Sequence, residues 1–351
     1  MIHSLGLDIG GANLKISYVS SDEKKIKYKK IITRYFPIWR RGKNRLLPTL
    51  RETLSYLPFK KYDIIAVTMT AELSDIYFDK KEGVNHILDT LVKIFPEDAI
   101  KVLNVRGELL PVDDARRKYI EVASANWYAT GWFTSKLAKN AIIIDIGSTT
   151  TSIIVVHNGI VYAKGLNDLE KLRYGELVYT GALRTNLAAI VHEVPYKDEM
   201  IPISSEYFAQ SADINLILGN ISEEQYIVDT PDGRGTSYEE CLARIARVIC
   251  GDLNILTEED IIEIAKYIYN QQVKQVIKGL ERLIRNITFN IKEYKAYLAG
   301  IGGSFLGREA LEKVGFKNIY ELERYIGYDA SAALPSYALA VMGIEYYKKG
   351  V

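Results

Sequence analysis

Two short segments far apart in the chain each place a carboxylate just before a glycine-containing turn. Asp8 precedes the first turn and Asp145 precedes the second. The backbone N–H groups of such turns hold phosphate oxygens, and a neighbouring carboxylate holds a hydrated Mg²⁺. Lys15, just after the first turn, adds a mobile cation. The residues predicted to bind phosphate are Gly10, Gly11, Ala12, Asn13, Gly147, Ser148, Thr149 and Thr150.

The two segments are copies of one strand–turn–strand unit. Aligning Asp145 on Asp8 places Gly147 on Gly10 without a gap, and the flanking apolar residues also coincide. One such turn would be a weak signal because its short pattern occurs by chance, whereas a duplicated hairpin is specific. We expect the copies to face each other across a cleft. A glycine-rich junction between a strand and a helix adds three further candidates, Gly300, Gly302 and Gly303.

Hydrophobic spacing indicates the elements that position these turns. Hairpins are expected at 4–19 and 141–156. Further strands are expected at 27–35, 64–68, 100–105, 160–162 and 296–298, and helices at 44–57, 83–95, 122–136, 239–249, 257–287 and 331–348. This is an α/β pattern, and 351 residues exceed what one hydrophobic core usually supports. We therefore predict lobes at 1–138 and 139–330, a helical and loop insertion around 185–290, and a C-terminal helix at 331–351 that packs back across the lobes.

Composition excludes several other classes of protein. A hydrophobic content of 48% with 25% charged residues is typical of a globular chain, and a formal charge of +1 argues against a nucleic-acid partner. The most apolar stretch is interrupted by Asp145, so no membrane association is expected, and the start shows no export signal. We expect a cytoplasmic protein. The four His residues show no ligand spacing, which argues against zinc or iron, and only five Gln residues suggest a heat-adapted source.

Three motifs carry a resemblance to a known superfamily. Residues 5–15, 145–151 and 300–303 resemble the first phosphate, second phosphate and adenosine motifs of sugar kinases, heat-shock proteins and actin. This resemblance implies two ribonuclease-H-like lobes, with mixed sheets flanked by helices and a central cleft. It also implies a possible nucleotide ligand.

Four segments carry a closer resemblance. Residues 10–13, 68–75, 123–127 and 174–181 are similar to the hydantoinase and oxoprolinase-related branch found in methanogens and methylotrophs, and within it to condensing enzymes of methanofuran biosynthesis. The resemblance implies an alkyl or aryl transferase rather than a kinase. Its small-molecule substrates would be 5-(aminomethyl)-3-furanmethanol diphosphate and the phenol of γ-glutamyltyramine, and pyrophosphate would be released.

The residues fit that chemistry. A furylmethyl carbon ionises readily because the ring oxygen delocalises positive charge, so the main task is to stabilise the departing pyrophosphate. The phenol, with a pKa near 10, needs a general base. Glu72 and Asp75, which follow a predicted strand, are the candidates. The candidate substrate-binding residues are Arg34, Arg106 and Asn126, although a surface ion pair is the preferred interpretation of each arginine.

Two other functions remain open. The first is an ATP-dependent small-molecule kinase or ring-opening hydrolase, which the adenosine-like run at 300–303 favours. Ser152 and Ala71 depart from those relatives, which often have a carboxylate and a glycine there, and this argues against ATP hydrolysis. The second is a non-enzymatic nucleotide switch, but only 48 residues follow Gly303, too few for a separate peptide-binding domain. The sequence leaves the oligomeric state open.

Overall fold

Each of the two duplicated hairpins forms the centre of a mixed sheet. The structure, a computed structural model, describes residues 1–22, 25–59 and 61–350. The chain divides into two units. The first unit comprises Met1–Ala141, Ile154–Lys171 and Leu322–Val351, and the second comprises Ile142–Ile153 and Leu172–Glu321.

The first sheet has the strand order β3-β2-β1-β4-β5-β6. β1 pairs antiparallel with β2 and parallel with β4, and β4 pairs parallel with β5. This is the ribonuclease-H-like arrangement that the sequence predicted. The strands are β1 (Ile2–Ile9), β2 (Asn13–Ser21), β3 (Ile26–Tyr35), β4 (Ile64–Met69), β5 (Ile100–Leu103) and β6 (Leu109–Leu110).

The helices of the first unit come from both ends of the chain. They are α1 (Ile38–Arg41), α2 (Leu46–Ser55), α3 (Lys80–Val92), α4 (Val112–Arg117), α5 (Tyr119–Val122), α6 (Asn126–Leu137), α12 (Glu323–Ile326), α13 (Tyr328–Ala332) and α14 (Leu334–Lys348). Short 3₁₀ turns lie at η1 (Lys43–Arg45), η2 (Ala71–Leu73) and η3 (Glu97–Ala99). The last helix begins at Leu334 rather than at the predicted Ser331, because the backbone leaves helical geometry at Ala333. Pro335 fits the first turn of this helix.

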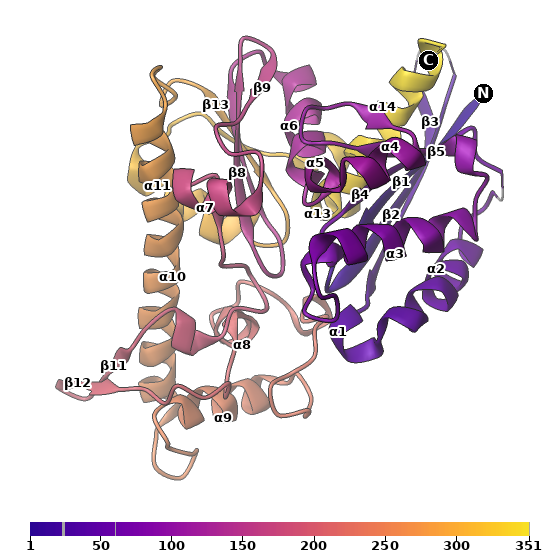
Figure 1. Cartoon of the computed structure of the whole chain (residues 1–351). Coiled ribbons are helices and arrows are strands. Elements are labelled where there is room, and N and C mark those ends of the chain that lie inside the picture. The colour runs from indigo at the N-terminus through magenta and orange to yellow at the C-terminus, as the bar shows by residue number, and fades with distance from the viewer. Residues whose placement is uncertain (23–24, 60, 351) are drawn as a thin grey trace. The chain divides into compact units, whose positions relative to one another are not determined.

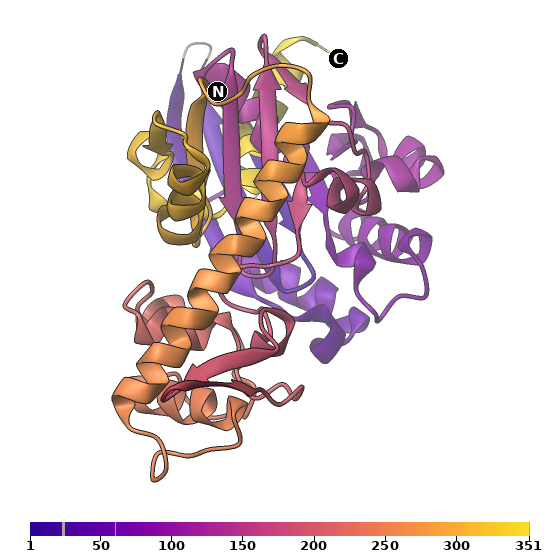
Figure 2. The same cartoon turned by 90° about the vertical axis from the view of Figure 1, so that its left-hand side faces the viewer.

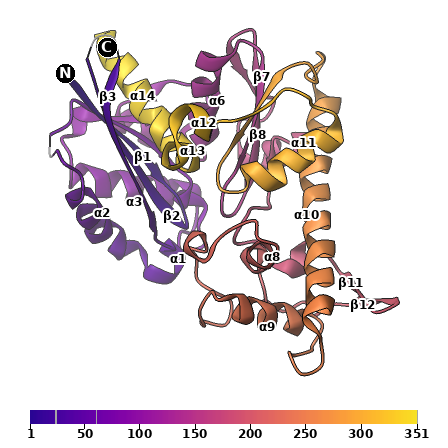
Figure 3. The same ribbon diagram turned by 180° about the vertical axis from the view of Figure 1, so that it is seen from behind.

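The two faces of the first sheet are covered differently. Leu7 of β1 belongs to a core cluster that also contains Leu50 of α2 and Ile87 of α3. On the other face α14 packs along β1, β2 and β4, as the yellow helix in Figure 3 shows. The approach is so close that a Cβ at Gly6 would lie 1.9 Å from the Ser336 carbonyl oxygen. This contact places the C-terminal helix in the first unit, whereas its packing across both lobes stays a prediction.

The second sheet has the order β10-β8-β7-β13-β14, with β9 pairing to β8. β10 pairs antiparallel with β8, and β13 pairs parallel with β14, as the corresponding strand pairs β3–β2 and β4–β5 do in the first sheet. The strands are β7 (Ala141–Ile146), β8 (Thr151–His157), β9 (Ile160–Tyr162), β10 (Leu177–Val178), β13 (Lys295–Ala299) and β14 (Ile319–Glu321). The predicted α/β fold class is confirmed, whereas the cleft between the lobes stays a prediction.

Several of the remaining elements, among them α8, α9, α11 and β11, pack on the long helix α10. Figures 1 and 2 show this orange helix with α8, α9 and the β11–β12 hairpin around its N-terminal part. Its start follows from a capping box, because Thr257 accepts a hydrogen bond from the Asp260 N–H. The elements are α7 (Asp168–Tyr174), α8 (Ser211–Ile217), α9 (Tyr238–Val248), α10 (Glu258–Asn286), α11 (Arg308–Val314), β11 (Glu193–Tyr196), β12 (Glu199–Pro202), η4 (Leu187–Ala189), η5 (Glu223–Gln225) and the π-turn η6 (Gly303–Gly307).

One predicted helix is shorter than expected. The spacing predicted a helix over 122–136, but the chain has a separate turn, α5, that ends at Val122, and α6 starts only at Asn126. Ser124 lies between them with a φ of +53°, a left-handed conformation that is incompatible with a continuous right-handed α-helix. No described helix combines the length and apolarity that crossing a membrane requires.

Candidate functional site

The two hairpin turns close in the same way. The Gly10 N–H donates to the Asn13 carbonyl oxygen at 2.9 Å, and the Gly147 N–H donates to the Thr150 carbonyl oxygen at 3.0 Å. The duplication inferred from the sequence therefore extends to the hydrogen bond that closes each turn. In both hairpins the carboxylate lies two residues before the glycine of the turn, at the end of a central strand.

A row of polar residues crosses the first sheet beside the first turn. Asp8 pairs in register with Lys15 on β2 and with Thr68 on β4. Residues in register on adjacent strands project from the same face of a sheet. Asp8 is 5% exposed and Thr68 is fully buried, and the Thr68 hydroxyl has no hydrogen-bond partner among the described residues. The structure thus brings Asp8 and Lys15 together, as predicted, and adds Thr68.

This row of residues can supply one carboxylate ligand to Mg²⁺, rather than all the ligands of a complete metal site. No group of three or more His, Cys, Asp or Glu side chains that could hold a metal occurs in the described part of the chain. Mg²⁺ is usually held by one or two carboxylates together with substrate phosphates. Asp8, the buried carboxylate next to the Gly10 turn, suits that role.

Glu72 lies in the segment that follows β4, next to the first turn. The Thr70 N–H donates to the Ile9 carbonyl oxygen at 3.0 Å, and a Cβ at Gly11 would lie 2.9 Å from the Ser74 hydroxyl. The hydrogen bond and this close approach lie on either side of Glu72 in the sequence, so the segment that contains Glu72 packs against the first hairpin turn. On the other side, α3 approaches so closely that a Cβ at Gly83 would lie 2.5 Å from the Glu72 Cα.

The Glu72 carboxyl group is buried in a small polar network. It is 1% exposed, and its Oε1 lies 2.9 Å from the Ser124 hydroxyl. The same hydroxyl lies 2.8 Å from Asp168 Oδ2, which is 3.3 Å from Lys80 Nζ. The second oxygen, Oε2, has no hydrogen-bond partner among the described residues. Burial raises the pKa of Glu72 to about 7, against the opposing effect of the Ser124 hydrogen bond.

The structure distinguishes the two predicted candidates for the general base. Glu72 is buried with a pKa near neutrality, a combination typical of acid–base residues. Asp75 lies in an exposed turn. The Ser124 hydroxyl completes the network. The backbone of Ser124 is held in place because its N–H donates to the Met69 carbonyl oxygen at 3.1 Å.

In the second unit the glycine-rich junction lies against Asp145. Gly300 follows β13 with a φ of +75°, and a Cβ there would lie 2.6 Å from Asp145 Oδ1. The Gly302 N–H donates to the Ile146 carbonyl oxygen at 3.0 Å, and Gly303 begins the π-turn that leads into α11. The structure therefore joins two motifs that lie far apart in the sequence.

Arg184 is a candidate site residue that sequence reasoning missed. Its N–H donates to the Ser148 carbonyl oxygen at 2.8 Å, and its Nη1 donates to the Thr149 hydroxyl at 3.1 Å. Gly181 permits this approach, since a Cβ there would lie 2.5 Å from the Thr149 nitrogen. The only sequence signal was the motif at 174–181, which ends three residues earlier.

The three predicted substrate-binding residues lie in different environments. Arg34 pairs in register with Leu14, a core residue, so it projects from the sheet face opposite to Lys15, and it forms an ion pair with Glu52 at 2.9 Å. Arg106 is on the loop after β5 with its side chain 60% exposed. Asn126 is half-buried at the start of α6, two residues after Ser124. Of the three, only Asn126 is close in the chain to the Glu72 network.

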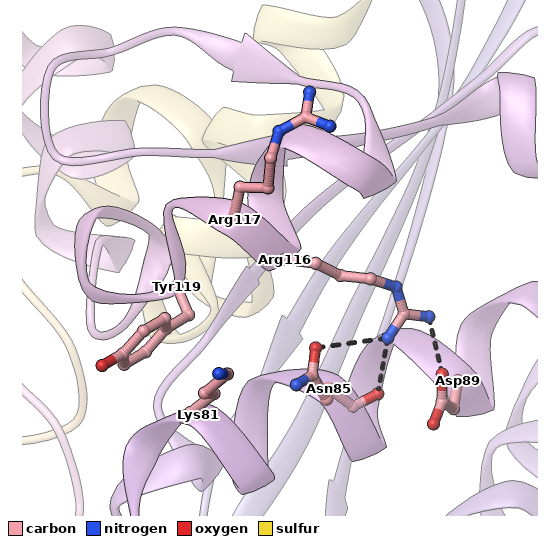
Figure 4. A pocket seen from close by; sticks show the side chains of 6 residues that line it. All are labelled: Lys81, Asn85, Asp89, Arg116, Arg117 and Tyr119. Carbon is pink, nitrogen blue, oxygen red and sulfur yellow. Dashed lines mark hydrogen bonds and ion pairs between the residues drawn. The ribbon is translucent and has the colours of Figure 1, made fainter.

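A separate open pocket lies between α3 and the α4–α5 segment (Figure 4). Arg116 reaches across it and donates to Asn85 Oδ1 at 3.3 Å and to Asp89 Oδ1 at 2.6 Å. Since this guanidinium is already paired and the pocket contains none of the predicted site residues, we assign it no function. Its lining residues are Lys81, Asn85, Asp89, Arg116, Arg117 and Tyr119.

Comparison with known proteins gives consistent results. The family model described as hydantoinase/oxoprolinase matches residues 63–344. A relative from Methanocaldococcus jannaschii, named (4-{4-[2-(gamma-L-glutamylamino)ethyl]phenoxymethyl}furan-2-yl)methanamine synthase, is 36% identical over 337 residues, which are 96% of each chain. A relative of the same name from Methanococcus vannielii is 34% identical over 60% of this chain and 93% of its own length.

A solved structure shows the fold alone. Nucleotide-free acetone carboxylase, described as carrying out ATP-dependent acetone carboxylation, aligns with a TM-score of 0.56 at 10% identity. The alignment covers 97% of this chain and 70% of that one.

Proposed function

Since the chain belongs to the hydantoinase/oxoprolinase family, we propose that it is the synthase that condenses a furanmethyl diphosphate with γ-glutamyltyramine in methanofuran biosynthesis. The name of the two relatives describes the product of that reaction, in which a phenol oxygen is bonded to a furanmethyl carbon. Identity of 36% over 96% of both chains supports the same product here. The diphosphate leaving group is the finer part of the proposal, supported by the duplicated phosphate-type turns.

The proposed reaction exchanges one C–O bond for another. The bond between the furanmethyl carbon and the diphosphate breaks, and its electron pair leaves with pyrophosphate. The Gly10 N–H is used to close the turn, so the amides after it in the turn and the Lys15 ammonium receive the phosphate oxygens. Asp8 would hold Mg²⁺, which when bound neutralises part of the pyrophosphate charge. Asp145 occupies the equivalent position in the second unit, and we propose that it also binds Mg²⁺. The variant Asp145→Asn tests this prediction.

The acceptor phenol loses its proton to Glu72. The new bond joins the phenol oxygen to the furanmethyl carbon, and the phenol proton goes to Glu72 Oε2, the oxygen without a partner among the described residues. General-base catalysis is most effective when the pKa of the base is near the working pH. The single observation that carries the proposed base is this buried carboxyl group beside the first turn, with a pKa raised to about 7.

The experiment is a direct product assay. Purified full-length protein is incubated with Mg²⁺, the furanmethyl diphosphate and γ-glutamyltyramine, and pyrophosphate and the coupled ether are quantified. We expect the two products in equal amounts. Pyrophosphate without the ether would mean hydrolysis, and no turnover of the diphosphate would refute the proposed reaction.

ATP-dependent phosphotransfer or hydrolysis is the second candidate function. It is favoured by the Gly300 turn, which lies against Asp145 as an adenosine-type turn would beside a phosphate site. The same protein is incubated with Mg²⁺, ATP and γ-glutamyltyramine, and ADP is measured. Substrate-dependent ADP formation would replace the condensation as the main proposal.

A further inference from the structure

The Ser124 hydroxyl contacts two carboxyl groups at once. It lies 2.9 Å from Glu72 Oε1 and 2.8 Å from Asp168 Oδ2, and all three residues belong to the first unit. A hydroxyl has one proton, so it donates to only one of these oxygens at a time. The other contact is a hydrogen bond only if that carboxyl group is protonated and donates to the hydroxyl oxygen.

Two arrangements satisfy both contacts with one proton on the pair. In one, Glu72 is protonated and donates to Ser124, which donates to Asp168. In the other, Asp168 is protonated and donates to Ser124, which donates to Glu72. Moving the shared proton through the hydroxyl converts one arrangement into the other, and no charge leaves the network.

We propose that Glu72 and Asp168 share one proton through Ser124, and that Asp168 thereby controls when Glu72 is ionised. This rests on the proposed function only for the catalytic consequence. When the proton is on Asp168, Glu72 is a carboxylate and its Oε2 accepts the phenol proton. Both carboxyl groups then carry a proton, and Asp168, whose side chain is 22% exposed, releases one to water and resets the network.

The local structure supports a network built for this purpose. Ser124 has a left-handed φ of +53°, which non-glycine residues adopt at a cost, often at functional sites. Lys80 Nζ lies 3.3 Å from Asp168 Oδ2 and orients this carboxyl group within the network. The charged or titratable groups that act on Glu72 are Lys80, Asp168 and Tyr77. Ser124 and Asp168 are positioning residues, because they act on substrate only through Glu72.

The first test is a carboxyl ¹³C NMR titration of the full-length protein without substrate. In the wild type we expect Glu72 and Asp168 to titrate together in two coupled steps. In Asp168→Asn the pKa of Glu72 falls, because a repelling carboxylate is lost. In Ser124→Gly it rises, because a hydrogen bond to the carboxylate is lost. A purely structural role would not shift the pKa of one carboxyl group in opposite directions.

The matched control is Asn158→Gly. Asn158 has the same φ of +53° but is exposed in the β8–β9 turn, so the substitution removes the same backbone strain without touching the network. We expect the Glu72 titration to be unchanged there. Independent titration of the two carboxyl groups in the wild type, or the same pKa of Glu72 in Asp168→Asn as in the wild type, would overturn the proposal.

Steady-state kinetics of the condensation then test the catalytic consequence. We expect Asp168→Asn to lower kcat by about 10-fold or more, to move the acidic limb of the kcat profile to lower pH, and to leave the KM of the diphosphate nearly unchanged. Coupled titration together with absence of any condensation would support proton sharing and refute the proposed function. Condensation with an unshifted profile in both network variants would refute control of Glu72 by Asp168.

Discussion

Glu72 is the residue whose environment most directly determines the proposed chemistry. Its carboxyl group is 1% exposed and burial raises its pKa to about 7. Because only the ionised form accepts a proton, we predict that kcat rises with pH through about 7 and then levels off. Glu72→Gln should lower kcat by roughly 10²- to 10⁴-fold and abolish this rise of kcat with pH. The measurement is the pH profile of kcat for both proteins, with Glu52→Gln as the surface control. If kcat of Glu72→Gln still rose with pH through about 7, Glu72 would be excluded as the base.

The same carboxyl group should make folding stability depend on pH. Its pKa is raised from 4.5 in the unfolded chain to about 7 in the folded protein, so the folded state binds more protons between these values. Its contribution is therefore complete below pH 4.5 and is lost as pH rises through about 7. The loss is on the order of 3 kcal/mol, since each pKa unit corresponds to about 1.4 kcal/mol. Urea unfolding from pH 5 to 8 should show a shallower decline in Glu72→Gln than in the wild type, and parallel curves would contradict the assignment.

Asp8 is predicted to bind the metal–diphosphate rather than to stabilise the fold. A ligand that binds only the folded state raises Tm, so Mg²⁺ with pyrophosphate should raise Tm of the wild type. Asp8→Asn should abolish turnover and this rise in Tm, while its own Tm without ligand stays near that of the wild type. Differential scanning calorimetry provides the measurement, with Asp89→Asn, on the surface of α3, as the control. A low Tm of Asp8→Asn without ligand would instead indicate a structural role.

At the scale of elements, the two hairpins share a turn but differ in how tightly it is packed. A Cβ at Gly10 would lie 2.7 Å from the Asn13 carbonyl oxygen, which is backbone and cannot move easily. At the equivalent Gly147, the nearest atom would be the Thr150 carbonyl oxygen at 3.8 Å, an ordinary contact. The same substitution should therefore have different effects in the two copies.

Gly10→Ala should lower the free energy of unfolding by about 1–3 kcal/mol, as insertion of a methyl group into packed structure usually does. Gly147→Ala should change it by less than about 0.5 kcal/mol. Each variant serves as the control for the other in urea unfolding. Equal effects of the two substitutions would mean that the turns are packed alike.

At the scale of the whole molecule, the first unit is completed by the end of the chain. α14 covers one face of β1, β2 and β4, and its backbone fits against Gly6 only because glycine has no side chain that would collide with the Ser336 carbonyl oxygen. A chain ending at Glu321 would expose that apolar face to water. We predict that this truncation aggregates or loses protection of the first unit in hydrogen exchange. A chain ending at Lys348, which keeps all of α14, should behave as the full-length protein does, and a well-folded short chain would contradict the assignment of α14 to this unit.

The amino-acid sequence alone determined the features that depend on local patterns. Alternating apolar residues and a glycine after a carboxylate were sufficient to find both hairpins, and a capping residue was sufficient to find the Thr257 start of α10, because turn geometry and capping involve residues a few positions apart. The ribonuclease-H-like class came from the resemblance of the motifs to a known superfamily. Asp8 and Lys15 could be placed together for the same reason.

Tertiary packing decided what depends on contacts between distant segments. Ser124 and Asp168 reach Glu72 from positions 52 and 96 residues later in the chain, and only this burial distinguishes Glu72 from Asp75. Arg184 meets Thr149 across 35 residues for the same reason. No periodicity encodes such contacts, since they arise when separate elements bury their apolar faces against one another and bring their polar groups together where water is excluded.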